Sequence, residues 1–153
     1  MSLQDQLSPA ETHKPRPSWD QFFLGLAEYT AQMATCPRLY VGACLVRHKQ
    51  VLSLGFNGAP AGHPHCTEIG CLIVDGGCLR TRHAEINAIM QAVQRGIDLK
   101  GATVYLTHSP CPDCARALIR EGIERVVFRT AYRKPEPLEM LQKAGIQTVH
   151  LPE

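Results

Sequence analysis

The spacing of one histidine, one glutamate and two cysteines constrains this chain more than any other feature. His83 and Glu85 lie in the segment RHAEI, and Cys111 and Cys114 lie in PCPDC. Imidazole and thiolate groups are common zinc ligands. Three protein ligands leave one tetrahedral position for water, which distinguishes catalytic from structural zinc. We therefore expect a fold that brings two distant segments together around one zinc ion.

Both ligand segments are expected at the N-terminal ends of helices. Apolar residues recur at helical spacing after His83 and again after Cys111, and Pro112 occupies a first-turn position where proline is tolerated. The positive ends of two helix dipoles would favour thiolates over thiols. Glu85 follows the histidine closely enough to reach the water without binding the metal, so we assign it catalytic proton transfer. A carboxylate that only complements the helix dipole is the structural alternative.

The combination H-x-E followed by P-C-x-x-C is the signature of zinc-dependent nucleobase deaminases. In that reaction water replaces the amino group of an aminopyrimidine or aminopurine. Glu85 would accept a proton from the water, give one to a ring nitrogen and help ammonia leave. A closed zinc knuckle without turnover is the rival from another class of protein, and a fourth protein ligand would favour it.

Length and composition indicate one domain with an ordinary core, since the chain has 153 residues, 44% of them hydrophobic and 20% charged. The net charge of +2 and the lack of a dense Lys/Arg tract argue against a nucleic-acid partner. We expect no membrane association, because no apolar run is long enough to span a bilayer. The first residues lack the apolar run of a secretory signal, so we expect a cytoplasmic protein.

The order of the expected elements indicates an α/β fold. Residues 1–17 are polar and interrupted by prolines, and we expect a flexible arm there, followed by one zinc-dependent deaminase domain over 18–153. A helix should begin at Ser18 and run to about Thr35. Its apolar stripe consists mostly of Trp19, Phe22, Phe23, Leu26 and Met33.

Two apolar runs, 41–46 and 51–56, predict a hairpin. Strands at 103–107, 125–128 and 147–150 then alternate with helices. This alternation predicts a three-layer α/β/α arrangement with a mixed sheet of about five strands.

Seven cysteines are many for a protein of this length. In cytoplasmic proteins, cysteines are more often metal ligands or catalytic groups than parts of disulfides. Cys44 lies in a predicted strand and is expected to be a small buried hydrophobe. The others outside the catalytic pair cluster around loops, and we hypothesise that they form a second, structural zinc site: Cys36, Cys66, Cys71 and Cys78. His63 and His65 are substitute ligands. The alternative is a set of reduced, unliganded thiols in a long connection.

Four segments, TCPRLYVGACLV, GFNGAPAG, HAEINAIM and YLTHSPCPDCA, together resemble the deoxycytidylate (dCMP) deaminases. The similarity extends from about Trp19 to the C-terminus and includes the bacterial late-competence type, within the zinc-dependent cytidine deaminase superfamily. It implies a cytidine-deaminase-like fold and hydrolytic conversion of dCMP to dUMP and ammonia in pyrimidine deoxynucleotide metabolism. The glycine-rich GFNGAPAG segment is what points to the deoxycytidylate branch.

The resemblance also implies roles for particular residues. It makes His83, Cys111 and Cys114 the zinc ligands and Glu85 the proton shuttle, and it implies substrate-binding roles for Asn57, Ala84 and Tyr132. Several family members are hexamers activated by dCTP and inhibited by dTTP, so we expect a homo-oligomer, hexamer or dimer, and these two effectors. Some members carry a second zinc on cysteines that match Cys36 and Cys66.

A monophosphate substrate requires cations or N–H groups that meet its charge. Arg80 and Arg82 are close to the catalytic histidine in sequence, and Arg133 and Lys134 follow Tyr132. We hypothesise that at least one of these four contacts the 5′-phosphate, for which arginine is well suited. The alternative is that all four are solvated surface charges.

Within the same reaction class, the nearest alternative function is a tRNA adenosine deaminase, which shares the catalytic signature and should show a basic groove. Deaminases of other nucleobases or nucleosides are further alternatives.

Overall fold

A computed structural model describes residues 14–60, 62–75, 77–78, 80–132 and 134–153. The first 13 residues of the expected arm lie outside this part of the chain, so the division at residue 17 stays a prediction. None of the helices in the described part is both long and apolar enough to cross a membrane.

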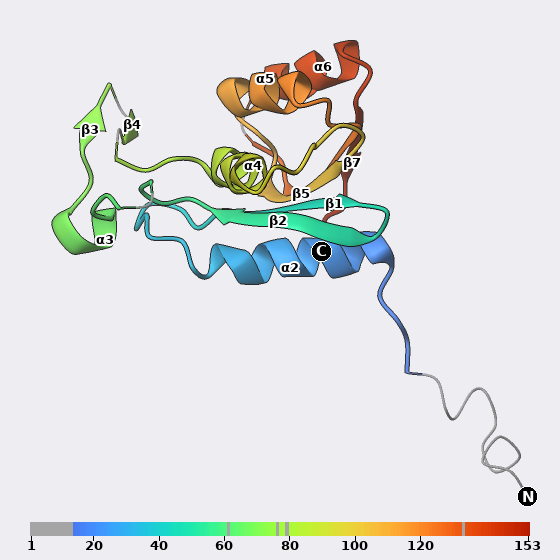
Figure 1. Cartoon of the computed structure of the whole chain (residues 1–153), viewed down its shortest axis with the longest axis horizontal. Coiled ribbons are helices and arrows are strands. Elements are labelled where there is room, and N and C mark those ends of the chain that lie inside the picture. Colours follow the sequence, from blue (N-terminus) through green and yellow to red (C-terminus); the bar gives the residue numbers. More distant parts are fainter. Residues whose placement is uncertain (1–13, 61, 76, 79, 133) are drawn as a thin grey trace, which may run out of the picture.

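The centre of the molecule is a five-stranded sheet in the order β2-β1-β5-β6-β7 (Figure 1). Strands β1 (Gly42–Arg47) and β2 (Gln50–Phe56) form an antiparallel hairpin, as predicted. Strand β1 is also antiparallel to β5 (Thr103–His108). Strands β6 (Arg125–Thr130) and β7 (Gln147–His150) continue parallel to β5. The predicted mixed sheet is confirmed.

Helices cover both faces of this sheet, which confirms the three-layer α/β/α arrangement (Figure 1). Helix α2 (Trp19–Ala31) lies on one face. Helices α4 (Ala84–Gln94), α5 (Pro112–Arg120) and α6 (Glu136–Lys143) lie on the other. The core therefore consists of two buried apolar layers, one on each side of the sheet.

Local sequence fixes where α2 begins. The Ser18 side chain accepts a hydrogen bond from the backbone of Gln21, whose side chain accepts one from Ser18 N–H, both at 3.1 Å. This capping box satisfies two otherwise free donors. The helix ends at Ala31, earlier than the expected Thr35.

The buried side of α2 differs from the predicted apolar stripe. It consists of Phe23, Leu24, Ala27 and Ala31, whereas Trp19, Phe22 and Met33 are exposed. The helix is apolar on two sides, and its own sheet buries the side with the small alanines.

Two glycines allow the helices to approach the hairpin closely. A Cβ atom on Gly42 would lie 1.9 Å from the Ala27 carbonyl oxygen of α2. A Cβ on Gly55 would lie 2.3 Å from the Ala84 carbonyl oxygen in the first turn of α4. The second contact sets the position of the helix that follows His83.

A smaller arm projects beside the sheet between β2 and α4 (Figure 1). It contains α3 (Cys66–Ile69) and the two-residue strands β3 (Ile73–Val74) and β4 (Gly77–Cys78). We call this segment, residues 66–78, the cysteine arm. An antiparallel bridge between Gly58 and Arg82 closes the connection at its base.

Candidate active site

The two predicted ligand segments meet at the N-terminal ends of two helices. His83 is the N-cap residue of α4 and Cys111 is the N-cap residue of α5. The Nδ1 atom of His83 lies 3.4 Å from Cys111 Sγ and 3.3 Å from Cys114 Sγ. Residues far apart in sequence thus place three ligand atoms within 4.8 Å of one another.

This geometry suits zinc. Zinc–sulfur bonds of about 2.3 Å and zinc–nitrogen bonds of about 2.0–2.1 Å imply nitrogen–sulfur separations of about 3.6 Å in a tetrahedral site. The observed separations are only slightly shorter. Among the described residues, the group contains no fourth histidine, cysteine or acidic ligand. The arrangement therefore fits a three-ligand site with one open position rather than a closed knuckle.

Electrostatics favours a thiolate at Cys111. The hydrogen bond with the Cys114 thiol and the contact with His83 lower the Cys111 pKa to about 4, although burial opposes this. Its partner His83 has a pKa raised to about 9, first by the hydrogen bond to Cys111. Zinc requires deprotonated thiols and a neutral imidazole, so binding it would release the proton of His83 and that of the Cys114 thiol.

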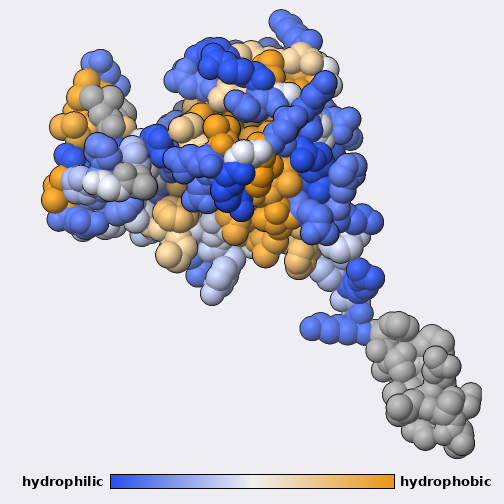
Figure 2. Space-filling model, viewed as in Figure 1, coloured by the Kyte–Doolittle hydropathy of each residue, from blue (hydrophilic) through white to orange (hydrophobic). Residues whose placement is uncertain are grey.

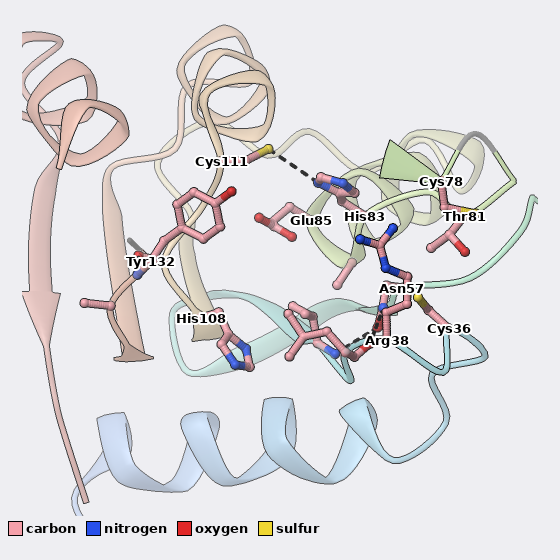
Figure 3. A pocket seen from close by; sticks show the side chains of 15 residues that line it. Cys36, Arg38, Asn57, Cys78, Thr81, His83, Glu85, His108, Cys111 and Tyr132 are labelled. Carbon is pink, nitrogen blue, oxygen red and sulfur yellow. Dashed lines mark hydrogen bonds between the residues drawn. The ribbon is translucent and has the colours of Figure 1, made fainter. Parts of the chain in front are cut away.

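Glu85 lies beside this group in the first turn of α4. It is only 4% exposed, and burial raises the pKa of its carboxyl group. Figure 3 shows this carboxyl group between Cys111, His83 and Tyr132, facing the cavity. A carboxyl group in this position is suited to accept a proton and to donate it again within one turnover.

The cavity in front of these residues has a volume of about 680 Å³, within the usual range for small-molecule sites. Its wall includes the three residues with a substrate-binding role implied by the resemblance: Asn57, Ala84 and Tyr132. The backbone N–H of Tyr132 donates to Ser109 Oγ at the end of β5. This bond attaches the tyrosine loop to the strand that leads to Cys111.

Asn57 also organises the cavity wall. Its side chain is buried, donates to the Leu39 carbonyl oxygen at 2.6 Å and accepts from Val41 N–H at 2.8 Å. These bonds hold the segment 38–41 against the site. The amide therefore has a positioning role in addition to any contact with a substrate.

Three of the four predicted phosphate contacts belong to the described residues, and none of these three lines the cavity. Arg80 donates to the Gly70 carbonyl oxygen, and Arg82 donates to the Asn87 side chain. Neither of them lines the cavity, nor does Lys134, and Arg133 lies outside the described residues. Within the described part of the chain, the one arginine or lysine that lines the cavity is Arg38.

Sequence reasoning missed Arg38 and His108. Arg38 lies in the TCPRLYVGACLV segment, and Figure 3 shows it beside Asn57 and Cys36. His108 ends strand β5, and burial lowers its pKa. Its position was a usable signal, because ligand sites in parallel sheets lie beyond the carboxyl ends of the strands. No comparable signal pointed to Arg38.

The cysteine arm brings together a second group. The Sγ atoms of Cys66, Cys71 and Cys78 lie within 4.8 Å of one another, and those of Cys66 and Cys78 are 3.5 Å apart. Cys36 is not part of this group, although it lines the cavity, as Cys78 does. His65 is the N-cap residue of α3, and its Nδ1 is 2.8 Å from Thr35 Oγ1. Cys44 is fully buried, as predicted.

Comparison with known proteins agrees with the site. Residues 17–130 match the family described as "Cytidine and deoxycytidylate deaminase zinc-binding region". The chain belongs to this family of zinc-binding deaminases, which confirms the resemblance seen in the sequence.

Similar proteins narrow the class. ComE operon protein 2 of Bacillus subtilis (strain 168) is 42% identical over 132 residues, which cover 86% of this chain and 70% of that protein. The deoxycytidylate deaminase of Mycobacterium phage D29 is 40% identical over 124 residues, 74% of this chain and 95% of that one. The dCMP deaminase from cyanophage S-TIM5, solved in complex with dCMP and dUMP, has a TM-score of 0.79 and 30% identity, covering 90% of this chain and 100% of its own.

Proposed function

We propose that this chain catalyses the hydrolytic deamination of dCMP to dUMP and ammonia. The observation that carries the proposal is buried Glu85 beside a three-ligand group at the wall of a nucleotide-sized cavity. Support for the substrate comes from the phage D29 relative, a deoxycytidylate deaminase, and from the cyanophage enzyme bound to dCMP and dUMP.

His83, Cys111 and Cys114 would hold the zinc ion, which when bound would lower the pKa of a water molecule to about 7. Glu85 would accept a proton as the water oxygen attacks C4 of the cytosine ring. The carboxyl group would pass that proton to ring nitrogen N3. It would then accept the remaining proton of the new C4 hydroxyl and give it to the amino group. The C4–N bond breaks, ammonia leaves and a carbonyl remains at C4.

A substrate panel tests this function. Ammonia release should be fastest with dCMP and slower with cytosine, cytidine, deoxycytidine and CMP. A tRNA substrate tests the alternative function, tRNA adenosine deamination. We expect no inosine to form from it. A preference for tRNA, or for a free base or nucleoside over dCMP, would contradict the proposal.

We propose that Arg38 contacts the 5′-phosphate of the nucleotide. Asn57 fixes the adjoining segment by its bonds to Leu39 and Val41, so the guanidinium is carried on a restrained loop. Arginine recognises phosphate through paired N–H donors, and a hydrogen bond to a charged group contributes about 1.5–3 kcal/mol. The rival candidates are the four residues predicted from the sequence: Arg80, Arg82, Arg133 and Lys134.

Alanine substitutions separate these candidates. Arg38→Ala should lower kcat/KM for dCMP about 10- to 150-fold while changing activity on deoxycytidine little. Arg80→Ala, Arg82→Ala, Arg133→Ala and Lys134→Ala are matched controls. If one of them, and not Arg38→Ala, removes the preference for the monophosphate, the sequence-based prediction holds and the Arg38 assignment is wrong.

We also propose a second, structural zinc site in the cysteine arm. The sulfur–sulfur distance of 3.5 Å between Cys66 and Cys78 approaches the separation of about 3.8 Å expected across a tetrahedral zinc. Cys71 supplies a third ligand atom, and Cys36, His63 and His65 remain candidates for the fourth.

Other expectations rest on the resemblance alone. We infer a homo-oligomer, hexamer or dimer, and control by dCTP and dTTP. The cytoplasmic location stays a prediction from the sequence.

A further inference from the structure

Helix α2 and the turn after it carry an apolar stripe that the described residues leave largely exposed. Trp19, Phe22, Tyr29 and Met33 are 44%, 45%, 73% and 63% exposed, and Leu26 between them is partly buried. These five residues follow one another at alternating intervals of three and four, which is the spacing of a helix-packing seam. The last of them, Met33, lies in the turn just beyond the end of the helix. We call them the α2 stripe.

Most of the stripe does not cover the sheet, although Trp19 and Phe22 contact the buried Phe23 ring. Phe23, Leu24 and Ala27 already bury the sheet-facing side of the helix. An ion pair of 2.7 Å between Glu28 of α2 and Arg129 of β6 connects one flank of the helix to the sheet. The stripe occupies the other flank, and Figure 2 shows hydrophobic surface over the region of α2 and the edge strand β2.

The exposed area of the stripe suits a protein interface. Large aromatic side chains bury about 150–250 Å² each, so the four exposed residues together present on the order of 500 Å². A standard interface covers about 800 Å² per partner, of which about 57% is apolar. The stripe alone therefore supplies about the apolar share of one side of such an interface. No Asp, Glu, Lys or Arg belongs to it, but Arg16 and Lys49 lie over the Trp19 ring at its N-terminal end, 5.9 Å and 5.1 Å from the ring centroid.

Gly25 gives a second, independent indication. It lies in the middle of α2, where glycine costs about 1 kcal/mol relative to alanine. A Cβ atom there would meet nothing within 4 Å. The described part of this chain thus gives no packing reason for glycine, whereas a closely approaching helix of another molecule would.

We propose that the α2 stripe packs against the α2 stripe of a second copy of this chain around a two-fold axis. From Phe22 to Met33 the stripe is apolar and uncharged, so two copies of it are self-complementary, as an isologous contact requires. Gly25 would lie where the two helices approach most closely. The contact uses the face of the sheet opposite α4 and α5, whose N-termini carry the proposed zinc ligands. The inference is independent of the substrate.

Particle mass tests the contact. In analytical ultracentrifugation, the double variant Phe22→Asp, Tyr29→Asp should contain half as many subunits as the unmodified protein. Tyr29→Phe should keep the original mass. Ile73→Asp, a change of the same kind at an exposed position in the cysteine arm, should also keep it. Zinc content and dCMP turnover report that each variant is folded.

A photo-crosslinker in place of Tyr29 tests the partner. Mixing isotopically light and heavy chains distinguishes cross-links between copies from those within one chain. The proposal expects cross-links between copies that map to residues 19–33. A monomeric unmodified protein, an unchanged mass in the double variant, or cross-links mainly to another protein or to residues 1–13 of the same chain would each overturn it.

Discussion

The molecule contains two three-ligand groups of similar composition in contrasting surroundings. His83, Cys111 and Cys114 begin two helices that rest on the buried sheet. The other group lies on the cysteine arm, whose helix has four residues and whose strands have two each. Only the first group, within the described residues, has a buried glutamate beside it. Ligand type therefore predicts metal binding, whereas the surroundings decide whether a metal can support catalysis.

The two groups also obtain their thiolates differently. At Cys111 the charge is stabilised first by the Cys114 thiol and then by His83. At Cys78 burial opposes ionisation, but backbone hydrogen bonds with Thr81, Leu72 and Arg80 outweigh it and lower the pKa to about 6. Cys78 and Thr81 also line the cavity. The arm would thus shape one wall of a site whose chemistry lies on the helices.

The largest expected effect comes from Glu85→Gln. Turnover of dCMP should fall about 10²- to 10⁴-fold, since general acid–base steps contribute that much. Zinc content should remain unchanged, because Glu85 is not among the proposed ligands. Turnover assays and metal analysis on the same sample check both statements. Loss of the catalytic zinc would show that Glu85 had been given the wrong role.

Gly55→Ala should displace helix α4 and with it His83, which belongs to the first ligand group. The added Cβ would meet the Ala84 carbonyl oxygen, and overpacking of this kind costs about 1–3 kcal/mol. Urea unfolding measures the loss of stability, and turnover should fall with it. The matched control is Gly70→Ala in the cysteine arm. There the added Cβ meets nothing within 4 Å, and the strain comes only from the φ of +85°. If the control reduces turnover as much, the contrast between the two regions fails.

Cys78→Ser should have a smaller effect on catalysis. The unmodified protein should contain two zinc ions per chain, and this variant should contain one. We expect KM for dCMP to rise more than kcat falls, because the arm shapes the cavity wall without moving protons. Cys44→Ser is the control, since this buried residue belongs to neither group. One zinc per chain in the unmodified protein would remove the structural site.

The smallest effect concerns an ion pair that serves neither group. Asp20 binds Arg125 at 2.6 Å, and this hydrogen bond is the main cause of its lowered pKa. Because the pKa of Asp20 is lower in the folded state than in the unfolded chain, the pair stabilises the protein at pH values above the unfolded-state pKa, which is about 4. This stabilisation is lost as the pH falls through the folded-state pKa. The pair is partly exposed, so Asp20→Asn should cost about 1 kcal/mol or less at neutral pH.

The difference in unfolding free energy between Asp20→Asn and the unmodified protein should shrink below pH 4. Taking this difference at each pH cancels changes at the zinc ligands, which both proteins share. A difference that stays constant down to pH 3 would mean that the pair does not titrate as inferred.

Local signals explain what could be predicted. The start of α2 follows from Ser18 and Gln21, and the ligand helices follow from the apolar spacing after His83 and Cys111. The hairpin follows from two apolar runs with a polar turn. Each of these depends on residues a few positions apart, where propensity and periodicity act directly. The end of α2 was less predictable, because helix ends depend on weak local preferences.

Contacts between distant residues were not predictable in the same way. Arg82 is next to His83 in sequence, yet its side chain bonds to Asn87, whereas Arg38 reaches the cavity from a remote loop held by Asn57. Sequence proximity is a poor guide to proximity in space once a chain has crossed a sheet.

The sequence by itself determined the ligand types, the acid beside them and the alternation of strands and helices, because these are written in short-range patterns. Only the tertiary structure decided which cation lines the cavity, which three of the four cysteines predicted for the second site meet, and which apolar side of α2 the sheet buries. Those outcomes depend on how elements pack across the whole domain. Packing selects among several locally acceptable arrangements by volume and close approach, as at Gly42 and Gly55.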